Sequence, residues 1–77
     1  MEDKEYNGWK NWTTWNIVLW VMNDEPAYRY LQERRPYKSV KARRVCQEIF
    51  GDKTPDGARI AAKCVDWKSI AEAFDEK

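Results

Sequence analysis

The sequence predicts a small all-α domain, a compact bundle of about four short helices around a tryptophan-rich central helix. Apolar residues recur at helical spacing in several segments, and turn-forming residues bound each segment. The chain has 77 residues, which is enough for one core, so we expect a single domain over residues 1–77. Leu, Ile, Val and Phe supply only 13 residues, but five tryptophans and four tyrosines add the apolar area that a small core needs.

The folded part is expected to begin near Trp9. Residues 1–8 are polar and contain the turn dipeptide Asn7-Gly8, which predicts a flexible arm. The first helix is expected over residues 12–23, with Asn11 or Thr13 as its N-cap and an Asp-Glu-Pro sequence directly after it. Such end signals are typical of a helix that stops sharply.

This first helix is apolar almost all round, which is typical of a central helix that its neighbours contact on several sides. Residues 17–21 are also prone to form a strand, but the length of the whole segment favours a helix. We expect Trp15 and Trp20 in the core. Asn16 and Asn23 occupy its narrow polar strip, and each is expected to bind a neighbouring loop or helix end, because a buried amide needs hydrogen-bond partners.

Two further helices are predicted in the middle of the chain. The second covers residues 26–34, starts with a proline and is ended by Pro36. The third covers residues 40–50, with Ser39 as its N-cap and Gly51 just beyond its end. Its apolar residues all fall on one side, which makes it the clearest amphipathic helix in the chain. They are Ala42, Val45, Cys46, Ile49 and Phe50.

A turn and a last helix complete the expected fold. Thr54-Pro55-Asp56-Gly57 has the composition of a turn, and residues 58–64 fit either a helical turn or an extended segment. Asp66 is expected to cap the last helix, over residues 67–74, where apolar residues repeat at i, i+3, i+4 and i+7.

The composition argues against catalysis and metal binding. Without histidine, the chain has no Ser-His-Asp or Cys-His pair and no His-containing zinc site. Cys46 and Cys64 are too few for a structural zinc site, and we expect the first to fill the core and the second to be half-buried. Carboxylates such as Asp24 and Glu25 could act as an acid or a base, but nothing in the sequence places a matched acid and base around a pocket. We therefore expect no enzyme activity and no cofactor.

The opening segment indicates a cytoplasmic protein with reduced thiols. It lacks the basic and apolar regions of a signal peptide, and no apolar run approaches the length of a membrane span. We therefore expect no membrane association. Asn11-Trp12-Thr13 matches the glycosylation pattern but should stay unmodified in that compartment.

Positive charge is concentrated in residues 34–44. The chain has a formal net charge of only +1, but this segment holds six basic residues and no acidic one, against eight basic and 13 acidic residues elsewhere. Such a cluster can bind phosphates or an acidic protein surface, although a solvated helix face has the same composition. On the third helix we expect Lys41 and Arg44 on the solvent side. The candidate partner-binding residues are Arg34, Arg35, Lys38, Lys41, Arg43, Arg44 and Trp9.

The aromatic residues and the basic segment are also compatible with nucleic-acid binding. Tryptophans exposed beside cations can stack on bases. For the tryptophans of the central helix we expect core packing instead. Trp9 and Trp12 are expected either to pack in the core or to anchor an interface. Residues 26–50 also have the outline of a helix-turn-helix, whose second helix would face a major groove. It would present Ser39, Lys41, Arg43 and Arg44 there.

A motif near the start resembles a family of small uncharacterised proteins carried by phages, plasmids and some bacteria. It is Asn7-Gly8-Trp9-Lys10-Asn11-Trp12-Thr13-Thr14-Trp15-Asn16-Ile17-Val18-Leu19-Trp20, followed by Asn23-Asp24-Glu25. The family opening is approximately N-G-x-x-N-[YW]-x-T-W-N-[VI]-x-L-W-x-x-N-[DE]-E. A weaker similarity follows in the TPDG turn and in residues 65–73. The basic segment has no counterpart in this pattern.

The resemblance implies a mobile-element context, in which proteins of this size often block host defence. Together with the basic cluster, it leads us to expect a non-enzymatic inhibitor of the anti-CRISPR type in the host cytoplasm. Its partner would be a host protein or a nucleoprotein defence complex, bound through protein–protein contacts. The alternative is a small nucleic-acid-binding regulator that uses the basic helix.

Overall fold

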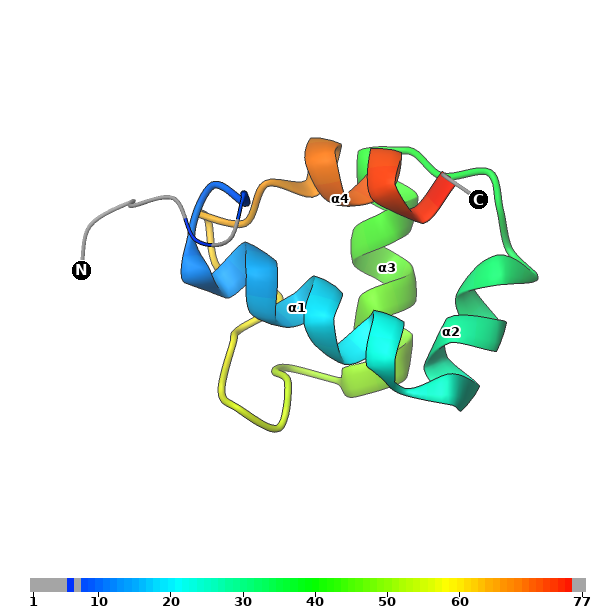
Figure 1. Cartoon of the computed structure of the whole chain (residues 1–77), viewed down its shortest axis with the longest axis horizontal. Helices are drawn as coiled ribbons and strands as arrows, with labels where there is room; N and C mark the ends of the chain where they lie inside the picture. The colour runs from blue at the N-terminus through cyan, green and yellow to red at the C-terminus, as the bar shows by residue number, and fades with distance from the viewer. Residues whose placement is uncertain (1–5, 7, 76–77) are drawn as a thin grey trace.

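The computed structural model describes residue 6 and residues 8–75, and this part of the chain forms an all-α arrangement (Figure 1). The predicted fold class is therefore confirmed. The helices are α1 (Trp12–Asn23), α2 (Glu25–Gln32), α3 (Ser39–Phe50) and α4 (Trp67–Asp75). The predicted arm lies outside the described residues except for Tyr6 and Gly8. Tyr6 pairs with Trp9 through two backbone hydrogen bonds of 2.7 and 2.8 Å.

Side chains cap three of the four helices at their N-termini, as the sequence predicts for two of them. Asn11 Oδ1 accepts the Thr14 N–H at 2.9 Å and starts α1, while Asp66 does the same for α4. Asp24 caps α2. Ser39 as the cap of α3 is wrong by one residue, because Lys38 holds the extended cap conformation and Ser39 is already helical. No side chain caps α3.

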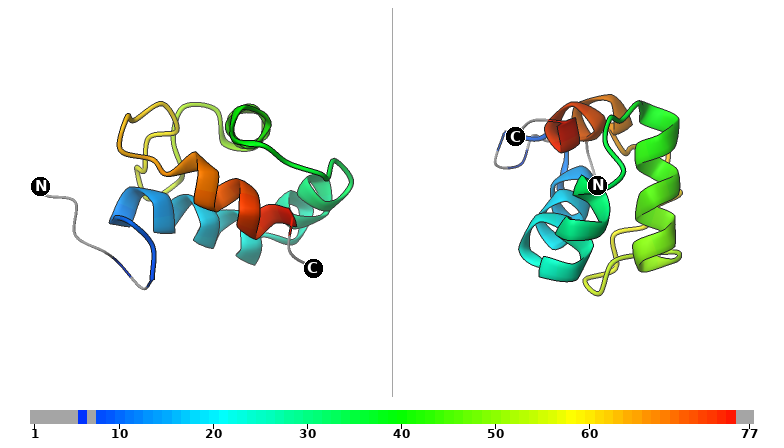
Figure 2. Two further views of the ribbon diagram at one scale, coloured as in Figure 1. Left: turned by 90° about the horizontal axis from the view of Figure 1, so that it is seen from above. Right: turned by 90° about the vertical axis from the view of Figure 1, so that its right-hand side faces the viewer.

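The helices pack in two pairs, α1 with α2 and α3 with α4, and α4 also contacts α1. Figure 2 shows α3 end-on where α4 is seen lengthwise, so α3 runs across α4. The packing of α2 on α1 leaves little contact between α2 and α3. The superficial helix-turn-helix outline of residues 26–50 is therefore not matched by a closely packed pair of helices. No helix among the described residues is long and apolar enough to cross a membrane.

The core lies where α1, α3 and α4 meet. Ile17 and Val21 of α1, Cys46 of α3 and Phe74 of α4 are all almost completely buried. The Phe74 ring meets the edge of Tyr37, at 5.2 Å between centroids. Burial raises the pKa of the Cys46 thiol to about 12, so this cysteine is a core filler as predicted.

Trp15 and Trp20 are not in this core, which corrects the sequence-based expectation. Both indoles are half-buried and flank the buried side of α1. Trp15 packs against Tyr6 at 4.6 Å between ring centroids, and Trp20 Nε1 donates to a carboxylate 3.1 Å away. The inward side of α1 carries the smaller aliphatic residues instead, because they fit between closely packed helices and have no polar atom to satisfy.

The segment between α3 and α4, residues 51–66, folds as a turn docked on α1. The predicted turn at residues 54–57 is confirmed: the Gly57 N–H binds Thr54 O at 2.8 Å, and Gly57 has a φ of 95°, which favours glycine. Residues 58–64 form no helix. Arg59 makes an isolated antiparallel bridge with Lys53.

The polar residues of the family-like motif attach this segment to α1. Asn16 is 1% exposed: its Oδ1 accepts the Thr54 hydroxyl at 2.7 Å, and its Nδ2 donates to Asp56 Oδ2 at 3.0 Å. Trp20 Nε1 donates to the same oxygen. At the other end of α1, Asn11 Nδ2 donates to Cys64 O at 2.7 Å. These residues therefore serve the scaffold.

The second amide predicted to make such a contact does not. Asn23 is exposed, at the end of α1, and makes no side-chain hydrogen bond with the described residues. Seven residues separate it from Asn16, close to two helical turns, but the hydrogen bonds of the docked segment end at Trp20 and do not reach Asn23. Sequence spacing alone does not distinguish the two positions.

Acid is expected to destabilise the domain through Asp56. Hydrogen bonds from Asn16 and Trp20 to its ionised form hold the pKa of this carboxyl below its usual range. The stabilisation is present above the unfolded pKa of about 3.9 and is lost as the pH falls through the lowered pKa. Thermal melts across the acid range should therefore show a shallower loss of Tm in Asp56→Asn than in the wild type. Parallel curves would contradict this role.

Candidate functional site

The six predicted basic residues fall into two groups, and the first group holds the connection between α2 and α3. The Arg34 guanidinium lies 3.5 Å from the centroid of the Tyr30 ring, and Arg35 donates to Asp75 O at 2.8 Å. Lys41 is half-buried, and its Nζ donates to the backbone oxygens of Arg34 and Pro36. The sequence predicts Lys41 on the solvent side of the helix, but its side chain is only partly exposed, because its ammonium binds carbonyl oxygens of the connection between α2 and α3.

The second group is exposed. The side chains of Lys38, Arg43 and Arg44 make no hydrogen bond or ion pair with the part of the chain that the structure describes. Two further exposed residues share their side of the helix: Gln47, and Val40, which is 76% exposed. We call this surface the α3 outer face. Its five members are Lys38, Val40, Arg43, Arg44 and Gln47.

Helical geometry makes these residues neighbours. Val40, Arg43, Arg44 and Gln47 follow one another at i, i+3, i+4 and i+7, the spacing of a single helix face. This spacing is present in the sequence and could have identified Val40 and Gln47. Attention to charge alone misses both of them, because neither is charged.

The α3 outer face carries no carboxylate. The one acidic residue of α3, Glu48, accepts the hydroxyl of Tyr30 on α2, and this hydrogen bond raises the pKa of Tyr30. The N-terminal turn of α3 has no side-chain cap, so its backbone N–H groups add partial positive charge at the end where Lys38 lies. In the right-hand view of Figure 2, α3 lies along one edge of the molecule. The result is an accessible helix face with two arginines and a lysine before it, bordered on the α2 side by the exposed carboxylate of Glu48.

Trp9, the seventh predicted contact residue, is not part of this face. It precedes α1, is half-buried and packs against the core. It also lines a hollow with Asp66 and Ser69 at the first turn of α4. Trp12 is 39% exposed, but it too belongs to α1. The exposed tryptophan therefore belongs to a different helix from the exposed arginines of the α3 outer face.

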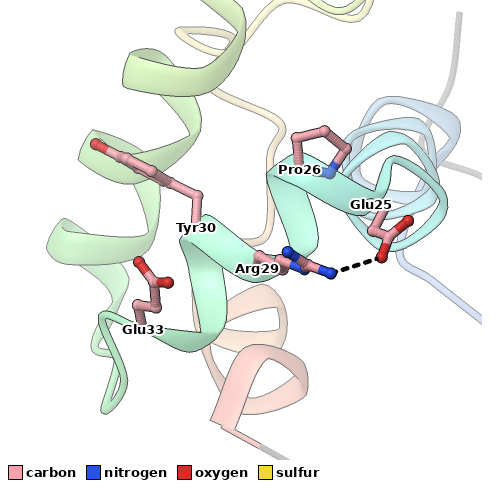
Figure 3. Close-up of a pocket in the computed structure, with 5 residues that line it drawn as sticks. All are labelled: Glu25, Pro26, Arg29, Tyr30 and Glu33. Carbon is pink, nitrogen blue, oxygen red and sulfur yellow. Dashed lines mark hydrogen bonds and ion pairs between the residues drawn. The ribbon is translucent and has the colours of Figure 1, made fainter.

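A shallow pocket along α2, away from the α3 outer face, offers no catalytic arrangement. Figure 3 shows this shallow pocket of about 430 Å³ along α2, where Arg29 and Glu25 form an ion pair of 3.1 Å. Asp24 is occupied as the cap of α2, accepting the Ala27 N–H at 3.2 Å. The carboxylates singled out from the sequence thus have local partners. Within the described residues, no three His, Cys, Asp or Glu side chains gather as a metal site would require.

Comparison with known proteins adds a family but no function. The model of a family described as a family of unknown function (DUF7249) matches residues 2–77. No curated protein and no solved structure matches the chain.

Proposed function

We propose that this chain, which belongs to the family of unknown function DUF7249, is a non-catalytic binding protein that inhibits a host defence system. In this proposal it comes from a phage or another mobile element and acts in the host cytoplasm. It docks on a nucleoprotein effector, as anti-CRISPR proteins do, and the α3 outer face makes the contact. The mobile-element setting derives from the motif resemblance, and the contact surface derives from the structure.

One observation supports the contact surface above all: two arginines and a bare valine share one face of α3, Lys38 directly precedes the helix, and these cations have no polar partner within the described fold. Arg34, Arg35 and Lys41 bind backbone oxygens within the fold, so they are not included in the proposed contact surface. The motif residues of α1 are likewise occupied by the segment that they hold. Exposed cations of this kind steer an acidic partner toward the surface and add to the affinity of the complex.

Arg43→Glu/Arg44→Glu is expected to abolish inhibition. Reversing two charges at a contact surface should weaken partner binding by more than about 30-fold, since loss of one buried interfacial charge partner already costs about 2–5 kcal/mol. Far-UV circular dichroism should stay unchanged, because both side chains are exposed. The readout is phage plaque formation on a host with an active defence system, with the chain supplied from a plasmid.

The matched control is Lys10→Glu/Lys68→Glu. It makes the same change in net charge at two exposed lysines, one before α1 and one in the first turn of α4. This variant should protect phage as well as the wild type does. Full protection by the arginine variant would remove the α3 outer face from the mechanism.

A further inference from the structure

The α3 outer face presents the side chains that recognise base edges in duplex DNA. Arginine pairs with the N7 and O6 atoms of guanine, glutamine pairs with the N6 and N7 atoms of adenine, and an aliphatic group contacts the methyl of thymine. Arg43, Arg44, Gln47 and Val40 supply all three chemistries on one face. An acidic protein surface would engage the cations but would give no comparable task to the exposed amide and valine.

The dimensions of this face also fit a major groove. Val40 and Gln47 are seven residues apart, so they span about 10 Å at the helical rise of about 1.5 Å per residue. The major groove of B-form DNA is about 12 Å wide and admits one helix. Lys38 precedes the helix, at the end of the face, where a phosphate at the groove edge would lie.

Single-stranded nucleic acid fits this surface less well. Proteins that bind single strands combine cations with exposed aromatic side chains on which bases stack. Here the exposed aromatics, Tyr6 and Trp12, lie before and at the start of α1. The α3 outer face carries no aromatic side chain. Its cations are therefore placed for a duplex.

We propose that α3 enters the major groove of duplex DNA and that Arg43, Arg44, Gln47 and Val40 contact base edges there. The proposal rests on the proposed function in taking the α3 outer face as the contact surface, and it names DNA as the component of the nucleoprotein that this face meets. It does not need the helix-turn-helix packing that the structure lacks, because a single exposed helix is what enters the groove.

Fluorescence anisotropy with labelled DNA tests this proposal. The full chain is titrated into a random-sequence duplex and the matching single strand, over a series of salt concentrations. We expect tighter binding to the duplex, with a slope of log K against log salt of about −2 to −3, since each neutralised phosphate contributes about −0.9 and the face has three cations. Arg43→Glu/Arg44→Glu should lose at least about tenfold in affinity, whereas Lys10→Glu/Lys68→Glu should bind like the wild type.

Selection of preferred sequences from the duplex library tests the base contacts. Gln47→Ala should bind the random duplex as the wild type does but lose the preference at one base position. The matched control is Lys38→Ala, which should weaken all sequences equally and reduce the salt slope by about one. No sequence preference in the wild-type protein would overturn the groove assignment.

Two results separate this proposal from the proposed function. If no duplex is bound at low salt while the arginine variant still loses phage protection, the DNA contact is wrong, and the α3 outer face meets an acidic protein surface instead. If the duplex is bound through Arg43 and Arg44 while the arginine variant still protects phage, the DNA contact is supported and the α3 outer face has no part in the anti-defence function. Equal loss of DNA binding in both charge-reversal variants would also overturn the DNA contact.

Discussion

Phe74→Ala is expected to remove a large part of the free energy of unfolding and to lower the melting temperature steeply. Phe74 is 1% exposed, sits between α3 and α4 and meets the edge of Tyr37. Truncating such a ring costs about 3–5 kcal/mol, because apolar burial is lost and the rigid surroundings leave a cavity. A domain of this size has a total stability of about 4–12 kcal/mol. Thermal unfolding followed by far-UV circular dichroism measures the loss.

Trp20→Ala is the informative comparison. Tryptophan is the larger side chain, and its place in an apolar helix predicts that its loss is the more damaging. The structure predicts the reverse order, because Trp20 is half-buried, flanking the buried side of α1, and its main specific contact is one hydrogen bond to Asp56. Its variant should still melt cooperatively. A Trp20→Ala protein less stable than Phe74→Ala would show that α1 is rotated the other way.

The second large effect is expected at Asn16. Asn16→Ala should cost about 2–4 kcal/mol, because it leaves the buried Thr54 hydroxyl without its acceptor and takes one of two donors from Asp56. Asn23→Ala is the matched control: the same substitution in the same helix, at an exposed position, should change the free energy of unfolding by less than about 0.5 kcal/mol. Equal losses in both variants would contradict the docking of residues 51–66 on α1.

A double-mutant cycle shows whether Asn16 and Thr54 act as a pair. Thr54→Val removes the hydroxyl while keeping the shape of the side chain. Residues in one hydrogen-bond network usually show coupling energies of about 0.5–3 kcal/mol. We expect coupling in that range from urea unfolding of both single variants and the double variant. Additive losses would mean that the two side chains contribute independently.

The helices of this chain could be predicted closely because the signals that bound them are local. Asn11 and Asp66 lie three residues from the N–H groups that they cap. Gly51 directly follows α3 with a φ of 81°, which glycine adopts without strain. The one capping error, at Ser39, amounts to a single residue. Such interactions depend on the neighbouring sequence and little else.

The candidate site could be predicted only in part. The density of basic residues in residues 34–44 is plain in the sequence, but it does not distinguish Arg43, which is exposed, from Lys41, whose ammonium binds backbone oxygens. That distinction depends on where the connection after α2 passes. Val40 and Gln47 join the surface through helix geometry, which becomes meaningful once the inward side of α3 is known.

The sequence by itself therefore determined the all-α class, the helix boundaries to within two residues (the second helix ends at Gln32 and not at residue 34), the turn at residues 54–57 and the charge of the middle segment. Only the tertiary structure decided which side of α1 is buried, what the motif residues bind and which cations stay exposed. The physical reason is the range of the interactions. Capping and periodicity act over about four residues, whereas the contacts of Asn16 with Asp56 and of Asn11 with Cys64 join positions 40 and 53 residues apart. An almost uniformly apolar helix has no local preference that could fix its rotation in advance.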